Sequence, residues 1–377
     1  NANMAMGIAS INGYVPFNNP NLYKLFSDSR EMQPSYNSTG LLTGFPRIGE
    51  ILRERNSMLS MLGVKYILDP LGYIPQDGSC LMVTGGKGQN VVKNQSLTLA
   101  VSLQTLAGGN YAFDIEPQTL YLLSFDADTA AAQSISADLY GGPSYDNGEQ
   151  ENSFQLTAGK SHYEFCFNSQ DTSAAKSTVL RFLAQPSADI VLSNITLQKI
   201  DRETQAGVYV YKTKIDDIPV YENMNAKELL FVPQRVEKTL GGDAFFDNSK
   251  AFNLTSVSYL SEGEVRDIDA NAKIENIVST LNTASAEVTA TSETFVNFSE
   301  CYFPGWRVYI DGQRSEIFVV NGTIQGAYVP AGTHMVEFSY HPTILYVSAG
   351  ISGFTFCIVI FWILAERRRE RKTSPKT

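Results

Sequence analysis

Residues 301–342 read CYFPGWRVYIDGQRSEIFVVNGTIQGAYVPAGTHMVEFSYHP, and apolar strands alternate there with tight turns. Residues 306–310 alternate apolar and polar side chains, as a half-buried strand does. Asp311-Gly312 and Asn321-Gly322 are dipeptides that tolerate the positive φ angles of tight turns. The pattern predicts a meander of three to four strands that ends at His341-Pro342.

Directly after this meander, residues 343–364 carry no charged side chain and are rich in Ile, Val, Phe and Leu. As a helix this segment would be about 33 Å long, which matches a bilayer core of roughly 30 Å. Tyr346 and Trp362 lie near its two ends, as interfacial anchors do. The alternative is the buried helix of a soluble core, but such a helix seldom precedes Arg-Arg-Arg. We interpret the segment as a transmembrane helix.

The charge distribution indicates how this helix is oriented. The chain of 377 residues has a net charge of −10, whereas residues 366–377 are basic, with Arg and Lys outnumbering Glu. Basic residues beside a span stay on the cytoplasmic side. We therefore expect residues 365–377 to be a cytoplasmic tail and the bulk of the chain to be extracytoplasmic. An acidic bulk argues against nucleic acid as a partner.

The start of the sequence shows neither an initiator Met nor a signal peptide. A body of this size does not cross a membrane unaided. We therefore expect the sequence to be the C-terminal part of a longer protein with upstream spans.

The rest of the chain predicts mainly β structure. Residues 1–75 predict a short α/β segment, and the short strands and turns of residues 88–200 predict a jelly-roll β-sandwich. Residues 201–249 are interpreted as a connector and residues 250–342 as a second β module. The expected fold class is mainly β, with two sandwich-like extracytoplasmic modules after the α/β segment and one C-terminal transmembrane helix, residues 343–364.

The sequence offers no convincing catalytic or metal-binding set. The four cysteines form no CxxC pair, although one pair among the three exterior cysteines could form a disulfide. The three histidines lack metal-ligand spacing. Asp126-Ala127-Asp128 has the DxD spacing of nucleotide-sugar transferases, but it closes a predicted strand, Leu120 to Asp126, and is interpreted as an exposed turn at the end of that strand. Gly85-Gly86-Lys87-Gly88 lacks the hydroxyl residue that ends a P-loop, and predicts a flexible turn between modules. We predict no catalytic residue, metal or cofactor here.

Aromatic residues are candidate glycan contacts, because sugars stack their CH faces on rings. Tyr140 and Tyr145 flank a Gly-rich turn of the predicted sandwich, where they either present their rings to a glycan or are simply exposed. Trp306 either packs in the core of the second module or faces an acceptor.

Residues 301–312 resemble the signature YYPGWxxxVDG near the end of the YfhO family of bacterial membrane proteins. Residues 88–200 look like a carbohydrate-binding jelly-roll module inserted into the family's pattern. Further segments that resemble the family, in its order, are residues 7–14, 62–68, 220–223, 328–334 and 336–342.

The resemblance implies a polytopic protein of the bacterial cell membrane, related to GT-C glycosyltransferases. These transfer sugar from a polyprenyl-phosphate donor, here to an envelope polymer such as lipoteichoic acid. The implied partners are the lipid bilayer, the donor and polymer through spans absent from this sequence, and carbohydrate. The family's acidic catalytic residue is expected in an early loop, so none carries over. The rival hypothesis is a non-enzymatic, membrane-anchored surface protein that binds carbohydrate or a protein partner.

Overall fold

The computed structural model describes Lys24 and residues 48–101, 107–117, 119–140, 152–169 and 175–373. Most of these residues lie in strands, and one long helix ends the chain, so the predicted mainly β fold class is confirmed. Most of the predicted N-terminal segment, the predicted glycan contact Tyr145 and the last four residues of the tail lie outside the described residues.

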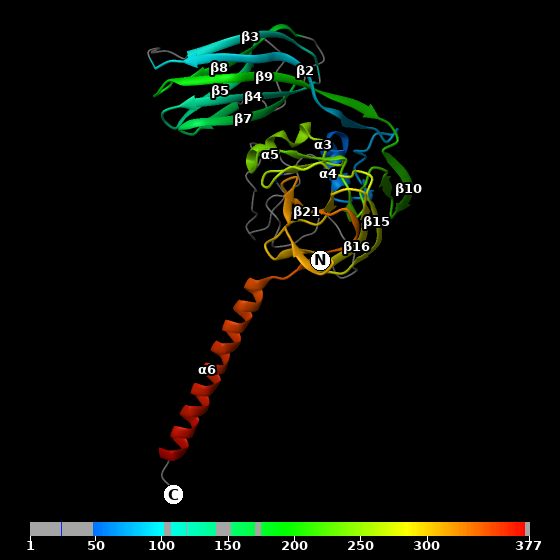
Figure 1. Ribbon diagram of the computed structural model, residues 1–377, viewed down its shortest axis with the longest axis vertical. Helices are drawn as coiled ribbons and strands as arrows, with labels where there is room; N and C mark the ends of the chain where they lie inside the picture. Colours follow the sequence, from blue (N-terminus) through cyan, green and yellow to red (C-terminus); the bar gives the residue numbers. More distant parts are fainter. Residues whose placement is uncertain are drawn as a thin grey trace.

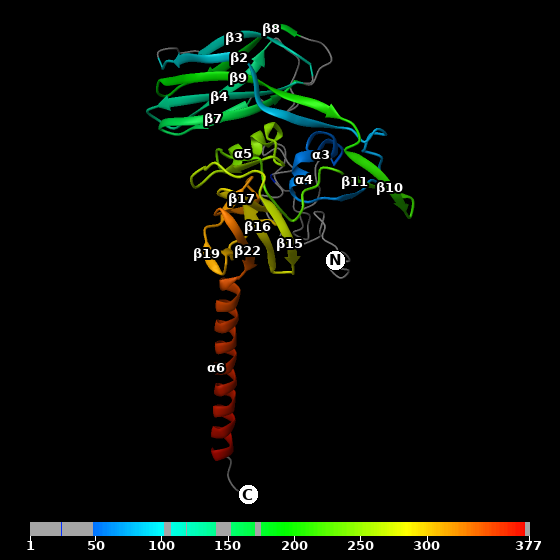
Figure 2. The same cartoon turned by 45° about the vertical axis from the view of Figure 1, so that its right-hand side comes forward.

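Residues 80–205 form two four-stranded antiparallel sheets, called the sandwich below (Figures 1 and 2). The strand orders are β2-β9-β4-β7 and β3-β8-β5-β6. The inward faces enclose an apolar core, in which Phe125 meets the rings of Phe154 and Phe182 edge-on at centroid distances of 5.1 and 5.4 Å. The strands are β2 (Cys80–Leu99), β3 (Ala107–Ile115), β4 (Leu120–Thr129), β5 (Gln133–Tyr140), β6 (Asn152–Leu156), β7 (Gly159–Asn168), β8 (Ala175–Ala184) and β9 (Ile190–Gln205).

The Gly-rich run Gly85-Gly86-Lys87-Gly88 lies inside β2, so its interpretation as a flexible turn is wrong. The pairing of β2 with β9 shifts register between Val83 and Lys87 and again between Lys87 and Asn90. Glycines suit such irregular places, because they tolerate the bends of a bulged strand. The paired ends of β2 and β9, residues 80–83 and 202–205, extend past the other strands of the sandwich and join it to the rest of the molecule (Figure 2).

Residues 230–340 supply a second pair of sheets, called the two-sheet module below. Its sheets have the orders β12-β17-β21-β20-β14-β13 and β15-β16-β22-β18-β19. The strands are β12 (Leu230–Phe231), β13 (Arg235–Lys238), β14 (Val257–Leu260), β15 (Lys273–Ser279), β16 (Thr283–Ala290), β17 (Thr294–Phe298), β18 (Trp306–Ile310), β19 (Gln313–Ser315), β20 (Phe318–Val320), β21 (Ile324–Val329) and β22 (Gly332–Tyr340).

The six-stranded sheet is covered on both faces. Val296 and Val329 pack toward the five-stranded sheet, whereas Phe295 and Tyr328 pack toward the helices. β21 is consequently buried at all six positions and shows no alternation of apolar and polar residues. The helices are α3 (Ile48–Glu54), α4 (Asn56–Met61), α5 (Asp243–Asn248) and the 3-10 turn η1 (Ser249–Ala251).

The predicted meander is wrong in one respect, because its strands divide between the two sheets. β18 and β19 form the expected hairpin, with Asp311 at φ 51° and Gly312 at φ 77°. The next hairpin, β20–β21, turns at Asn321-Gly322 but belongs to the six-stranded sheet, and β22 returns to pair with β18. The turn at Pro330 therefore carries the chain from one sheet to the other.

A three-stranded lateral sheet and the C-terminal helix complete the molecule. The lateral sheet has the order β1-β11-β10 and consists of β1 (Tyr66–Leu68), β10 (Tyr209–Ile215) and β11 (Ile218–Asn223). Helix α6 (Thr343–Thr373) follows β22 directly and points away from the sheets. The sandwich lies at the opposite end of the molecule from α6 (Figures 1 and 2).

Candidate functional site

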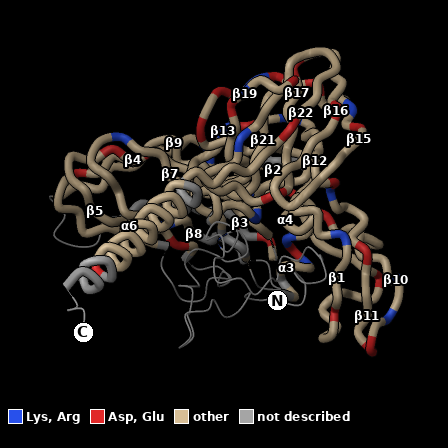
Figure 3. Tube along the Cα trace, turned by 90° about the horizontal axis from the view of Figure 1, so that it is seen from below, with Lys and Arg blue, Asp and Glu red and all other residues tan. Residues whose placement is uncertain are grey.

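Helix α6 is long and apolar enough to cross a membrane over Val347–Glu366, and none of this window is buried against the rest of the structure. Seen along the molecule, it carries no charged residue over most of its length (Figure 3). The alternative of a buried core helix is therefore wrong. An exposed apolar helix of this length is suited to the hydrocarbon core of a bilayer, because its side chains are apolar and its backbone groups are hydrogen-bonded within the helix.

The outer face of the sheet β2-β9-β4-β7 is divided into an apolar and a polar half. Even-numbered residues of β4 lie on this face, because successive side chains of a strand alternate. At one end Leu120, Leu122 and Cys166 pack with Ala251 and so join the sandwich to η1. At the other end the face carries charged and amide side chains, and Asp126 is at their centre.

Asp126 is held by donors from two neighbouring strands. His162 Nδ1 lies 2.7 Å from Oδ1, while Asn194 Nδ2 donates to Oδ2 at 2.8 Å and Lys160 Nζ lies 3.4 Å from Oδ2. These hydrogen bonds, that from His162 foremost, hold the pKa of Asp126 below its ordinary value. β4 continues to Thr129, so Asp126-Ala127-Asp128 lies inside the strand, and its interpretation as an exposed turn at the strand end is wrong.

The imidazole of His162 lies between two carboxylates. Its Nε2 is 3.6 Å from Glu164 Oε1, and Glu164 together with Asp126 raises the pKa of His162 despite its partial burial. The described residues contain no group of three or more His, Cys, Asp or Glu that could hold a metal ion. With its carboxylate already bonded to three partners, Asp126 serves as the anchor of a polar surface.

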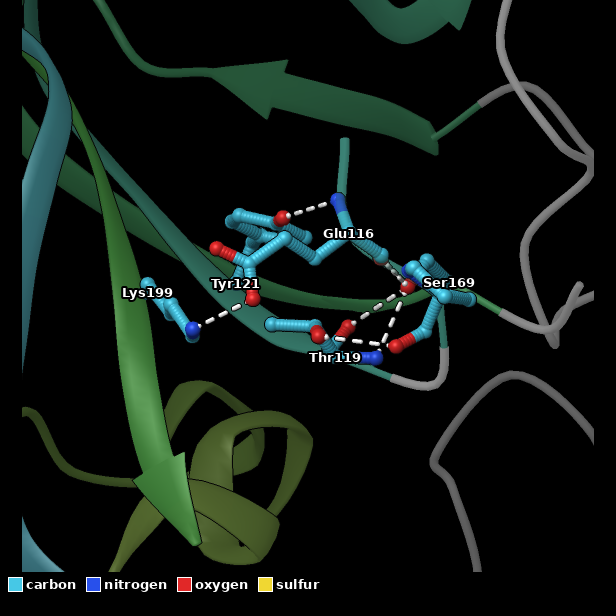
Figure 4. Close-up of polar contacts among 6 residues, drawn as sticks. Glu116, Thr119, Tyr121, Ser169 and Lys199 are labelled. Atoms are coloured by element: carbon cyan, nitrogen blue, oxygen red, sulfur yellow. Dashed lines mark hydrogen bonds and ion pairs between the residues drawn. The ribbon is translucent and has the colours of Figure 1, made fainter. Parts of the chain in front are cut away.

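A second polar network fastens the β3–β4 connection at the edge of the sandwich (Figure 4). The Ser169 hydroxyl donates to Glu116 O at 2.7 Å and accepts from Thr119 N–H at 2.8 Å. The Tyr121 hydroxyl accepts from Glu116 N–H at 2.9 Å, and Lys199 forms an ion pair with the Glu116 carboxylate. These contacts satisfy backbone groups that the chain reversal leaves unpaired, so the network is structural.

Trp306 packs between two aromatic rings of the two-sheet module. Its centroid lies 5.2 Å from that of Phe298, edge-on, and 5.3 Å from that of Tyr340. Gly305 has φ 120°, and a Cβ there would lie 3.0 Å from the Tyr340 ring and 3.1 Å from His341 O. The glycine of the PGW sequence therefore lets the chain pass close to Tyr340, next to which Trp306 packs. The acceptor-facing role of Trp306 stays a prediction.

The other two predicted glycan contacts stay predictions as well. Tyr140 is the last residue of β5, and its backbone pairs with Val179 in β8. Tyr145 lies outside the described residues. Tyr140 belongs to the sandwich, whereas Trp306 belongs to the other pair of sheets, so the structure does not bring these two together.

The Asp126 cluster was not predicted, although the sequence carries a signal for it. In β4 and β7 the polar residues Asp126, His162 and Glu164 are all even-numbered, whereas the apolar residues Phe125 and Phe165 are odd-numbered. Two such strands paired side by side gather their polar residues on one face. The expected disulfide alternative is also resolved, since all four cysteines lie in the described part of the chain and are free thiols.

Residues 250–352 match the model of a family described as bacterial membrane protein YfhO. The resemblance to YfhO is thereby confirmed over this segment. The YfhO segment contains most of the two-sheet module and the start of α6, so its strands lead directly into the candidate membrane helix. No curated protein matches the chain.

Solved structures similar to this chain include two carbohydrate-binding modules and one arabinofuranosyltransferase. The module described as BiXyn10A CBM1 is 16% identical, covers 33% of this chain and 97% of its own, and has a TM-score of 0.21. A module of lichenase 5A from Cellvibrio mixtus, in complex with cellotriose, is 11% identical over 32% and 96%, with a TM-score of 0.19. The arabinofuranosyltransferase AftD from Mycobacteria is 8% identical over 69% and 26%, with a TM-score of 0.18.

Proposed function

We propose that this chain is the extracytoplasmic and C-terminal part of a polytopic membrane glycosyltransferase. The enzyme transfers sugar from a polyprenyl-phosphate donor to an envelope polymer similar to lipoteichoic acid, and residues 1–377 position that acceptor. The observation that carries the proposal is the YfhO match, which runs through the two-sheet module into an exposed apolar helix. The transfer chemistry belongs to spans outside this sequence.

The arrangement of the chain supports different roles for the sandwich and the two-sheet module. With residues 343–364 of α6 in the membrane and residues 365–377 in the cytoplasm, the two-sheet module adjoins the outer membrane surface and the sandwich is held farthest from it. A polymer that grows away from the membrane passes both units. We assign the sandwich, with Tyr140 and Tyr145, to holding a distant portion of that polymer, and the two-sheet module to the portion near the membrane.

Removal of the sandwich from the full-length protein tests this assignment. Val83 of β2 pairs directly with Arg202 of β9, so residues 84–201 can be replaced by Asn-Gly as a two-residue hairpin turn. The short strands on either side keep their pairing. We expect normal membrane insertion and reduced glycosylation of the polymer. Undiminished glycosylation at equal protein level would count against an acceptor role.

A pair of point variants separates glycan contact from loss of the fold. Tyr140→Ala combined with Tyr145→Ala should weaken retention on immobilised envelope polymer. Tyr211→Ala is the matched control, because Tyr211 is an exposed tyrosine of the lateral sheet, outside the sandwich. Equal retention of both variants would remove the two tyrosines from the proposed site.

The rival hypothesis of a non-enzymatic surface protein gives a different outcome in the same strains. A surface binder would lose polymer retention on removal of residues 84–201 while polymer glycosylation in the cell stayed at the wild-type level. Protease added to intact cells tests the proposed orientation, since it should cut the sheets and spare the Arg-rich end of α6.

A further inference from the structure

A pocket of about 370 Å³ lies between two segments that are distant in the sequence. Residues 226–232, which lead into β12 and out of it, form one wall, and residues 270–274, which lead into β15, form the other. The volume falls within the range of small-ligand sites. The side chains that matter for its chemistry are Lys227, Glu228 and Phe231.

Main-chain contacts hold the first wall in place. Lys227 N–H donates to Ser60 O at the end of α4 at 2.8 Å. Ser299 N–H donates to Leu229 O at 2.9 Å, and the Ser299 hydroxyl donates to Glu228 O at 3.2 Å. Lys227 and Glu228 therefore project from a backbone that is fixed on both sides.

A carboxylate holds the second wall. Asp269 accepts hydrogen bonds from Asn271 N–H at 2.9 Å and from Thr291 N–H at 2.7 Å. These bonds keep the pKa of Asp269 low, those from Thr291 foremost, and they fix the turn that presents Ala270 and Ala272 to the pocket. Both walls are thus formed before any ligand arrives, which lowers the entropic cost of binding.

Lys227 is a half-buried cation in this pocket. Burial lowers its pKa, and its Nζ lies 5.9 Å from the centroid of the Phe231 ring. Within the described residues no carboxylate forms an ion pair with Lys227, in contrast to Lys212, which pairs with Glu222. A partly desolvated charge without a counter-ion is costly, and an anion that enters the pocket removes that cost.

Glu228 adds an acceptor beside this cation. It is exposed at the pocket, and its carboxylate can accept hydrogen bonds from hydroxyl groups but repels a second anionic group. Phe231 is buried and offers no free face for stacking a sugar ring. A ligand that suits both charged residues carries one phosphate next to one or more hydroxyls.

We propose that this pocket binds a phosphorylated polyol unit, with the phosphate oxygens at Lys227 and a hydroxyl at Glu228. The source of that unit rests on the proposed function, in which the acceptor is a phosphate-bearing envelope polymer. The pocket then fixes one repeat of the polymer in the two-sheet module, between the sandwich and the membrane. It is a binding site and takes no part in the transfer step.

Calorimetric titration of the complete chain in detergent micelles tests the proposal, with glycerol phosphate as the probe. We expect Lys227→Met, which keeps the aliphatic stem, to weaken binding about tenfold, the loss of one charge-assisted contact. Lys227→Arg should retain most of the affinity. Lys273→Met is the matched control, because Lys273 is an exposed lysine next to the lining residue Ile274 and should leave affinity unchanged.

Two further ligands separate the parts of the recognition. Inorganic phosphate should bind more weakly than glycerol phosphate, and glycerol more weakly still. Equal binding of glycerol and glycerol phosphate, or an unchanged affinity in Lys227→Met, would overturn the proposal. If Lys273→Met loses as much as Lys227→Met, the effect is general charge attraction and the pocket is not the site.

A spectroscopic measurement excludes a merely structural role for Lys227. In the chain with 13C-dimethylated lysines, the depressed pKa of the Lys227 amine should rise when glycerol phosphate is added, and the other lysine signals should stay in place. The glycosylation result with residues 84–201 replaced does not depend on this pocket. Failure of the pocket and failure of the proposed function are therefore distinguishable.

Discussion

The sandwich and the two-sheet module are both pairs of packed sheets, but they are closed in different ways. In the sandwich, β2 pairs with β9 along most of its length, so the first and last strands of the unit hold it together. In the two-sheet module, neighbouring strands such as β15–β16 and β18–β19 pair across short turns. Its six-stranded sheet is then buried between a second sheet and the helices.

This difference predicts different sensitivities in the two regions. The sandwich depends mainly on one core between its own sheets; it shares a small apolar joint with η1, and only Cys80 and Met82, at the start of β2, belong to the larger core. The two-sheet module is tied to α4, α5 and the lateral sheet through a larger core. We expect the sandwich to open without the two-sheet module, whereas damage to the six-stranded sheet should spread to the elements that cover it.

The largest effect is expected for Phe125→Ala in the sandwich. Phe125 is fully buried and contacts Phe154, Tyr163 and Phe182, so its truncation leaves a cavity that costs about 3–5 kcal/mol. Hydrogen exchange followed by mass spectrometry should show faster exchange in β4 and β7 and unchanged exchange in β16 and β22. Faster exchange in all four strands would mean that the two regions unfold as one unit.

Gly326→Ala tests the expectation that damage to the six-stranded sheet spreads to the helices that cover it. A Cβ at Gly326 would lie 2.5 Å from the Phe295 ring and 2.8 Å from Val296 O, so the six-stranded sheet must shift to accept it. Overpacking of this kind costs about 1–3 kcal/mol. Denaturant unfolding should show the lower free energy of unfolding, and hydrogen exchange should rise in α4 and α5 as well as in β21.

A second glycine of the same module serves as the control. Gly312 has φ 77° and nothing within 4 Å of its Cβ position, so Gly312→Ala meets only backbone strain, about 1 kcal/mol. Hydrogen exchange in the Gly312→Ala variant should rise only locally, at β18 and β19. If Gly312→Ala also raised exchange in the helices, the coupling would not come from the crowded position of Gly326.

The same contrast explains how much of the fold the sequence could predict. Asp311-Gly312 and Asn321-Gly322 identified their turns correctly, because turn preference is a local property. The sheet to which β20 and β21 belong could not be predicted, since hydrogen-bond partners are chosen among strands far apart in sequence. β2 was missed for a related reason, because its glycines are tolerated only where β9 supplies a partner with shifted register.

The candidate sites follow this pattern. Trp306 was considered a core residue or an acceptor contact, and the structure shows its packing against Phe298 and Tyr340. Asp126 and His162 could have been found by alternation once β4 and β7 were taken as neighbours. The Lys227 pocket could not be found, because one of its walls adjoins β12 of the six-stranded sheet and the other adjoins β15 of the five-stranded sheet.

Each of the two units contains a His–Asp pair, which gives a further comparison. His162 lies 2.7 Å from Asp126 in the sandwich, and His334 lies 2.6 Å from Asp311 in the two-sheet module. The pKa of His162 is raised by Glu164 and Asp126, and that of His334 by Asp311 and Ala331 O. A histidine whose pKa is raised by folding stabilises the folded state. This stabilisation is fully present below about pH 6.5, the ordinary pKa of the unfolded chain, and is lost as the pH rises through the pKa of the folded state.

Titration of the histidine ring protons by NMR measures both pairs. Glu164→Gln should lower the pKa of His162 toward its ordinary value and leave His334 unchanged, and Asp311→Asn should do the reverse. Because each variant is the control for the other, a shift of both histidines in either variant would contradict two separate local pairs. The change in stability should be smaller than for the core variants, since both pairs are partly exposed.

The smallest effect is expected at the edge of the sandwich, within a single network. Lys199 pairs with Glu116, but most of the Glu116 side chain is exposed, so Lys199→Met should cost only about 0–1 kcal/mol. Ser169 is buried and serves three backbone groups of the same network, so Ser169→Ala should cost about 1–3 kcal/mol. Denaturant unfolding of both variants compares the ion pair with the buried hydroxyl. A larger loss for Lys199→Met would mean that the charge pair, and not the hydroxyl, fastens the β3–β4 connection.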